Sequence, residues 1–214
     1  MPPPRAVVFD NDGLLLDTEP CWTRAQEAVF ARRGKVFDLD AKHALVGTSP
    51  VTAAAVLERL LDAPGRGHEL SAEMYDLALT AIADGATPRP AAVELVSELR
   101  SRLPVAVASN APRRHLLAGL GRADLGHAFT VTVTVEDVEQ PKPAPDLYAR
   151  ACELLGVPAA SAIALEDSPP GVASARAAGL YVIGIPSVVG VTLEADLVAS
   201  SLADSPVREA LGLS

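Results

Sequence analysis

Five short apolar segments, separated by helical patterns, constrain the fold of this chain more than any other feature. They are rich in β-branched and other aliphatic residues and cover residues 6–9, 103–109, 129–135, 163–165 and 181–185. Helical patterns lie between the later segments at 113–120, 145–155 and 170–178. Strands that alternate with helices predict a mostly parallel sheet with helices on both faces. We therefore predict a doubly wound, Rossmann-like α/β core.

The segment 20–84, by contrast, shows only helical patterns. One predicted helix runs from Pro20 toward Gly34, a second begins at Ser49–Pro50 and reaches residue 61, and a third covers 69–83. Residues 14–19 are too few for a strand with its own partner and are predicted to be a tight loop. The predicted domains are an α/β core of residues 1–16 and 86–214 and an inserted all-helical cap of residues 17–85. A short final strand and helix are expected within 191–203.

Composition excludes several classes of function. The formal charge of −9 and the pI near 4.9 argue against nucleic acid or an anionic membrane as a partner, because both demand a basic face. Two cysteines are too few for a disulfide framework, and the first residues lack the apolar core of a signal peptide. We expect a cytoplasmic protein that binds neither nucleic acid nor membrane. Whether it is a monomer or a weak dimer stays open.

Polar side chains follow each of the first four predicted strands. Because the ligand crevice of an open parallel sheet lies beyond the carboxyl ends of its strands, these residues form the candidate site. They are Asp10, Asp12, Ser109, Asn110, Glu136, Asp137, Glu166, Asp167 and Ser168. Lys142 lies in a loop stiffened by Pro141, Pro143 and Pro145. We predict that these acids, hydroxyl and amide groups and the lysine gather at one edge of the sheet.

Asp10 and Asp12 follow the first strand directly, with Gly13 after them to let the backbone turn. Residues two apart on an extended segment point the same way, so both carboxylates can face one pocket. At an effective dielectric of about 20, two such charges ~4 Å apart repel by roughly 4 kcal/mol. A cation, a shared proton or both would relieve this repulsion. The alternative is a solvated turn in which the two acids share no site.

The predicted group of side chains suits magnesium and a phosphoryl group. Mg²⁺ prefers a few carboxylates, several waters and a phosphate oxygen to a complete cage of protein ligands. Lysine and hydroxyl donors stabilise the charge on the oxygens of a transferring phosphoryl group. Individually, Ser109 could be a helix N-cap and Lys142 a solvated loop charge. Their common place at strand ends favours phosphate chemistry.

Four segments resemble, in order and in spacing, the signature motifs of the haloacid dehalogenase superfamily. They are 9–13 (FDNDG), 108–110 (ASN), 142–146 (KPAPD) and 165–168 (LEDS). The helical segment resembles the small cap of the branch that includes β-phosphoglucomutase and many sugar-phosphate phosphatases. The resemblance implies a magnesium-dependent enzyme that transfers a phosphoryl group. Its substrate would be a small phosphorylated metabolite, such as a sugar or polyol phosphate.

The resemblance also implies a role for each residue. Asp10 would attack phosphorus to give an aspartyl-phosphate, and Asp12 would protonate the leaving oxygen and then activate the hydrolytic water. The residues that would hold the phosphoryl group are Ser109, Asn110 and Lys142. Mg²⁺ would sit on the Asp10 carboxylate, the main-chain carbonyl of Asp12 and Asp167. Glu166 would lie close by or coordinate the ion through water.

Departures from the family pattern bear on the reaction. Members that cleave carbon–halogen bonds lack the second aspartate, so Asp12 argues against a dehalogenase. The mutase branch carries a histidine near the position of Trp22 and an arginine in the cap loop, whereas residues 46–50 (VGTSP) contain none. Both departures favour a phosphatase, with a phosphosugar mutase as the alternative. A phosphorylatable signalling module or a non-catalytic binding protein are further alternatives.

Histidines and two arginines complete the candidates. The four histidines, at 43, 68, 115 and 127, lack metal-ligand spacing, and solvated or capping roles are expected for them. Arg113 and Arg114 either meet an anionic substrate or are surface charges at the start of a helix. Gly47, in the cap loop, is expected to approach the substrate from above.

Overall fold

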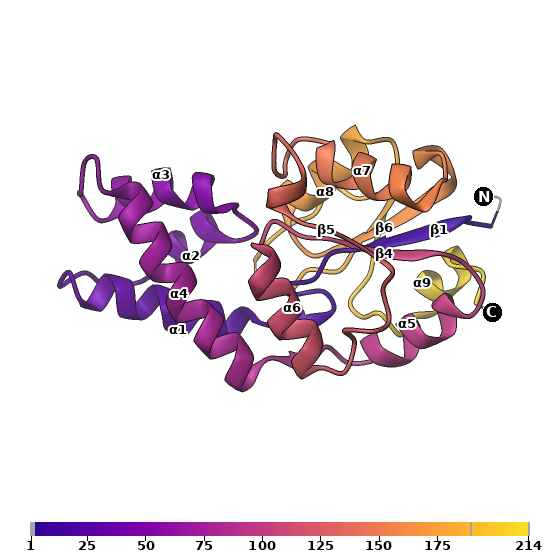
Figure 1. The fold of residues 1–214 in the computed structure, drawn as a ribbon, viewed down its shortest axis with the longest axis horizontal. Helices are drawn as coiled ribbons and strands as arrows, with labels where there is room; N and C mark the ends of the chain where they lie inside the picture. Colours follow the sequence, from indigo (N-terminus) through magenta and orange to yellow (C-terminus); the bar gives the residue numbers. More distant parts are fainter. Residues whose placement is uncertain (1–2, 189, 214) are drawn as a thin grey trace.

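A six-stranded parallel sheet forms the centre of the computed structural model, which describes residues 3–188 and 190–213 (Figure 1). Its order is β5-β4-β1-β6-β7-β8, and every neighbouring pair is parallel. The strands are β1 (Ala6–Phe9), β4 (Val105–Ala108), β5 (Val131–Val133), β6 (Ala162–Glu166), β7 (Tyr181–Gly184) and β8 (Leu197–Val198). The chain leaves β1 toward β4 and β5 and later returns to the other side of β1 at β6. The crevice of such a sheet is therefore expected at the carboxyl end of β1.

Helices cover both faces of the sheet. Alternate residues of β1 point to opposite faces: Val7 and Phe9 belong to one apolar cluster, and Ala6 and Val8 belong to another. One face packs against α5 (Ala92–Arg100), α6 (Arg113–Arg122) and α9 (Ser205–Ala210), and the other packs against α7 (Asp146–Leu155) and α8 (Pro169–Ala177) (Figure 1). The predicted doubly wound fold is confirmed.

Four helices between β2 and β3 form a separate body with its own apolar cluster, which includes Val29, Leu57 and Met74 (Figure 1). They are α1 (Glu19–Ala31), α2 (Leu39–Leu45), α3 (Pro50–Leu60) and α4 (Gly67–Gly85). Helix α3 begins where the sequence predicts, and Ser49 caps it by accepting a hydrogen bond from the backbone N–H of Thr52 at 3.3 Å. The division into cap and core stays a prediction, and its core range includes residues 1, 2, 189 and 214, which lie outside the described residues.

Three details of the sequence prediction were wrong or incomplete. The loop predicted at 14–19 contains a strand, β2 (Leu16–Asp17), which pairs antiparallel with β3 (Thr87–Pro88). Helix α2 was not predicted. The last helix, α9, starts after the predicted range 191–203, although that range does hold the short strand β8. No helix in the described part of the chain has the length and apolar character to cross a membrane.

Candidate active site

A pocket lies between the carboxyl edge of the sheet and the cap helices α1, α2 and α4. The core contributes Asp10, Asp12, Ser109, Asn110, Ala111, Lys142, Asp167 and Ser168 to its wall. The cap contributes Thr18, Glu19, Trp22, Gln26, Lys42, Leu45, Val46, Gly47, Thr48, Met74 and Tyr75. Most of the predicted strand-end residues are therefore brought together here, although they come from distant parts of the chain.

Lys142 joins three strand ends through its ammonium group. Its Nζ donates to Asp10 Oδ1 at 2.6 Å, to the carbonyl oxygen of Ala108 at 2.8 Å and to Glu166 Oε1 at 2.6 Å. All of these groups are buried. Burial by itself lowers the pKa of Lys142, but the negative charges of Asp10 and Glu166 outweigh burial and raise this pKa. Lys142 is thus held as a cation between two carboxylates.

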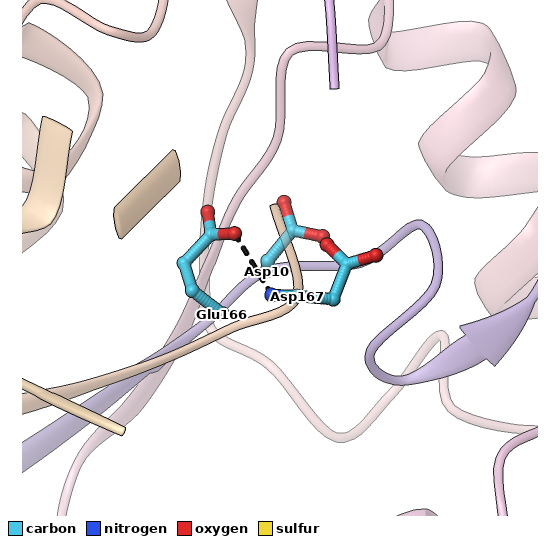
Figure 2. Close-up of side chains that lie close together, drawn as sticks. All are labelled: Asp10, Glu166 and Asp167. Carbon is cyan, nitrogen blue, oxygen red and sulfur yellow. Dashed lines mark hydrogen bonds between the residues drawn. The ribbon is translucent and has the colours of Figure 1, made fainter. Parts of the chain in front are cut away.

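Asp10, Glu166 and Asp167 form a buried acidic cluster, with one oxygen from each lying within 4.8 Å of the others (Figure 2). Burial raises the pKa of Asp10 from 3.8 to about 8; Lys142 opposes this shift, and Glu166 adds to it. Burial, followed by the charge of Asp10, also raises the pKa of Asp167. One lysine therefore does not balance three acids, and the cluster favours a further cation or protons.

Glu166 uses both of its oxygens in hydrogen bonds. Oε1 accepts from Lys142 and from the hydroxyl of Tyr148 at 2.7 Å, and Oε2 accepts from the backbone N–H groups of Asp167 and Ser168 and from the Ser168 hydroxyl. A Cβ at Gly171 would lie 1.9 Å from Glu166 Oε1, so a larger residue at this position would clash with the Glu166 carboxylate. Five donors leave Glu166 little capacity for a metal ion.

Asp10 and Asp167 are better suited than Glu166 to hold a metal ion. The hydrogen bonds of the described residues engage only Oδ1 of Asp10 and only Oδ2 of Asp167, which accepts from the Ser187 hydroxyl. Gly13, at φ +87°, permits this approach, because a Cβ there would lie 2.1 Å from Asp167 Oδ2. Two carboxylate oxygens facing one point fit Mg²⁺, which prefers hard oxygen ligands and keeps several waters.

Asp12 is positioned from both sides of the pocket. Its Oδ1 accepts hydrogen bonds from the Thr18 hydroxyl at 2.8 Å and from Trp22 Nε1 at 3.2 Å. Its Oδ2 faces the hydroxyl of Ser109 at 3.4 Å. Trp22 stacks on the His115 ring, with centroids 5.8 Å apart. Sequence reasoning noted the place of Trp22 but missed its hydrogen bond to Asp12, since that contact depends on how the cap packs.

Asn110 connects the core to the cap loop. Its Oδ1 accepts from the Lys142 backbone N–H at 2.9 Å, and its Nδ2 donates to the carbonyl oxygens of Gly47 at 2.8 Å and Lys142 at 3.3 Å. Gly47 lines the pocket at φ +66°, and a Cβ there would lie 2.8 Å from the Ser168 hydroxyl. The side chain of Asn110 therefore holds the cap loop and the Lys142 loop together.

Two predicted strand-end acids lie away from both the pocket and the acidic cluster. Glu136 accepts from the backbone N–H of Arg113 at 2.8 Å, and Asp137 forms an ion pair with the Arg113 guanidinium. Both acids also bind the side chain of Thr134. The prediction that they join the site is wrong, because the chain forms a short 3₁₀ helix after β5 and turns them toward α6.

Arg114 has one of its two predicted roles, an exposed charge at the start of α6, whereas His115 differs from expectation. Arg114 pairs with Asp76 of α4 at 2.6 Å, between the core and the cap. His115, expected to be solvated or capping, is buried, and its Nε2 lies 2.7 Å from the carbonyl oxygen of Tyr75. Burial lowers the pKa of His115, so this ring favours its neutral form.

Similar proteins are known. A sequence profile of the haloacid dehalogenase-like hydrolases matches residues 4–179. The chain is 30% identical over 179 residues to the fructose-1-phosphate phosphatase YqaB of Escherichia coli, covering 84% of this chain and 95% of that protein. It is 29% identical to a phosphorylated carbohydrates phosphatase of Thermotoga maritima, over 82% of each protein. The crystal structure of CbbY from Rhodobacter sphaeroides in complex with phosphate superposes with a TM-score of 0.81 at 28% identity, covering 94% of this chain and 96% of that one.

Proposed function

The chain belongs to the haloacid dehalogenase-like hydrolase family, and we propose that it is a magnesium-dependent phosphatase of sugar or polyol phosphates. As a phosphoric monoester hydrolase it shares its activity with the relatives named above. The observation that carries the proposal is the buried contact of 2.6 Å between Lys142 and Asp10 beside Asp167. This contact supports the proposal, because a carboxylate that could attack phosphorus, a buried cation and a second carboxylate lie together.

In the proposed reaction, Asp10 attacks phosphorus and forms an aspartyl-phosphate. Asp12 protonates the leaving oxygen and then takes a proton from the water that hydrolyses the intermediate. Lys142, Ser109 and Asn110 hold the phosphoryl oxygens, with Asn110 acting through its backbone N–H because its side chain binds Gly47 and the Lys142 loop. Two steps replace one slow displacement, which is the usual benefit of covalent catalysis.

Mg²⁺ would be held by the carboxylates of Asp10 and Asp167 and by the main-chain carbonyl of Asp12. When bound, it would supply positive charge to the phosphoryl oxygens and lower the barrier to displacement. Burial raises the pKa of Asp10 to about 8, whereas a nucleophilic carboxylate must be ionised near pH 7. A bound cation would lower this pKa, and the need for one supports this part of the proposal. The family resemblance implies that Glu166 lies beside the ion or coordinates it through water, but we assign Glu166 to holding Lys142 and the 167–168 backbone.

We favour the phosphatase over the phosphosugar mutase. The mutase branch carries a histidine near the position where this chain has Trp22. In this chain, Trp22 Nε1 donates a hydrogen bond to Asp12. The cap loop contributes the Gly47 carbonyl to Asn110 and contains no arginine between residues 46 and 50. A location in the cytoplasm is part of the proposal and accords with two buried, unpaired cysteines, Cys21 and Cys152.

The proposal is tested by measuring phosphate release from a panel of phosphorylated metabolites with and without Mg²⁺. We expect release from at least one sugar or polyol phosphate, its loss on adding EDTA, and recovery with excess Mg²⁺. Activity that EDTA leaves unchanged would contradict the metal requirement. Conversion of a sugar phosphate to its isomer with little free phosphate would instead support the mutase.

A further inference from the structure

The cap wall of the pocket carries one ion pair. Lys42 Nζ on α2 lies 2.7 Å from Glu19 Oε1 at the start of α1. Thr23 reinforces the pair by donating to Glu19 Oε1 at 3.1 Å and accepting from Lys42 Nζ at 3.2 Å. The side chains of Glu19 and Lys42 are each 23% exposed, and both residues line the pocket. A bound molecule can therefore reach them.

This pair neutralises the cap wall. Among the described cap residues that line the pocket, Glu19 and Lys42 are the charged ones, and the others are apolar, aromatic, hydroxyl, amide or glycine residues. Lys42 is already engaged by a carboxylate, so it offers little free positive charge to a second anionic group. A second anion entering here would also meet Glu19, which repels it.

Gln26 adds a hydrogen-bond acceptor to the same wall. It lies on α1, one turn after Trp22 and two turns after Glu19. It is 5% exposed, and its Oε1 has no hydrogen-bond partner among the described residues. A buried acceptor without a donor is costly, and functional sites are a common place for one. Because the carboxamide can turn about its last torsion, its oxygen can meet a hydroxyl group of a bound molecule.

We propose that Glu19, Lys42 and Gln26 form a subsite for an uncharged, hydroxyl-bearing leaving group and select monophosphates against substrates with a second anionic group. The inference rests on the proposed function, since the phosphoryl group must lie at Asp10 and Lys142 for the rest of the substrate to face the cap. The paired ions and the amide offer donors and acceptors to hydroxyls. They offer no net charge to a second phosphate or a carboxylate.

The test compares matched substrates that differ by one anionic group. Fructose 1-phosphate is paired with fructose 1,6-bisphosphate, and glycerol 3-phosphate is paired with 3-phosphoglycerate. The readout is the ratio of kcat/KM for the uncharged member to kcat/KM for the anionic member. The wild-type ratio is expected to be at least about tenfold in favour of the uncharged member.

Removing the charge of Glu19 and removing the charge of Lys42 should move this ratio in opposite directions. Glu19→Gln frees Lys42 and is expected to lower the ratio about tenfold, whereas Lys42→Gln leaves Glu19 unpaired and is expected to raise it. The matched control is Glu69→Gln, which removes the same charge from a cap ion pair of 2.6 Å with Arg66 that does not line the pocket. That control is expected to keep the wild-type ratio.

Gln26 is tested separately with fructose 1-phosphate and its deoxy analogues. Gln26→Leu removes the amide at similar size and is expected to reduce the preference for the hydroxylated compound by about tenfold. A preference unchanged by this variant would remove Gln26 from the subsite.

Each outcome has a distinct meaning. Hydrolysis of these compounds with ratios that Glu19→Gln and Lys42→Gln leave unchanged would overturn this inference and leave the phosphatase intact. A wild type that prefers the anionic members would also overturn it. If the wild type released phosphate from none of them and from no simple aryl phosphate such as p-nitrophenyl phosphate, the proposed function would fail as well.

Discussion

The core wall and the cap wall of the pocket balance their charges in different ways. The core wall buries three acids around Lys142, and burial raises the pKa of both Asp10 and Asp167. The cap wall pairs one acid with one lysine, both partly exposed to solvent. An excess of buried negative charge suits a cation, which can in turn bind a phosphoryl group, whereas a neutral polar wall suits a hydroxylated leaving group. Catalysis and substrate choice are thus assigned to different elements.

The largest difference between the two walls is expected at their lysines. Lys142→Met leaves the Asp10 and Glu166 carboxylates without their buried cation, so phosphate release should fall by at least ~10³-fold. Stability should also fall, by about 3 kcal/mol. Lys42→Met, on the cap wall, should lower phosphate release by less than about tenfold. Phosphate release and thermal unfolding measure these losses. If both variants lost similar activity and stability, the proposed difference between the two walls would be contradicted.

The second effect is a pH dependence that belongs to the core wall. In metal-free protein the pKa of Asp10 is about 8 when folded and 3.8 ordinarily, so between these values the folded state binds more protons. Stability should therefore fall as pH rises from 5 to 8, by at least about 2 kcal/mol. Added Mg²⁺ should stabilise the protein more at pH 8 than at pH 5. Thermal unfolding in EDTA and in Mg²⁺ measures both trends.

Asp10→Asn is the control for this pH dependence. It removes one of the two groups whose pKa burial raises, the other being Asp167, so the metal-free slope between pH 5 and 8 should become shallower. A slope that stays as steep in this variant would show that another group is responsible.

A smaller effect is expected where the walls meet, at Trp22. Trp22→Phe keeps the aromatic packing but removes the hydrogen bond to Asp12, so the proton donor is held less firmly. Hydrolysis of alkyl phosphates should slow about tenfold, because their leaving groups need a proton. Hydrolysis of p-nitrophenyl phosphate, whose leaving group needs none, should change less than about threefold. Equal losses on both substrate types would indicate a merely structural role.

The smallest effect is expected at Tyr148, beneath the core wall. Its hydroxyl donates to Glu166 at 2.7 Å, and Lys142 Nζ lies 4.9 Å from the centre of its ring. Tyr148→Phe keeps the ring and removes one of five donors to Glu166, so kcat should fall by about fivefold or less. A loss as large as that of Lys142→Met would mean that Tyr148 takes part in the chemistry.

Local patterns were sufficient to predict the strands of the central sheet and the edge at which several candidate residues meet. Apolar runs that end in polar residues placed Asp10, Ser109 and Asp167 at one edge, because parallel strands end together. The pattern could not predict β2 and β3, which are two residues each and lie about 70 positions apart. Tyr148 was missed because a buried residue on α7 resembles ordinary core in the sequence. Asp137 was misplaced because the turn after β5 is set by its bonds to Thr134 and Arg113.

The most direct test of the account is the rate of phosphate release by Asp10→Asn. The matched control is Asp137→Asn, which changes a strand-end acid that does not line the pocket. We predict that Asp10→Asn folds, as shown by circular dichroism, and releases no measurable phosphate, while Asp137→Asn stays within about threefold of wild type. Phosphate release at the wild-type rate by folded Asp10→Asn would contradict the central claim that Asp10 is the nucleophile.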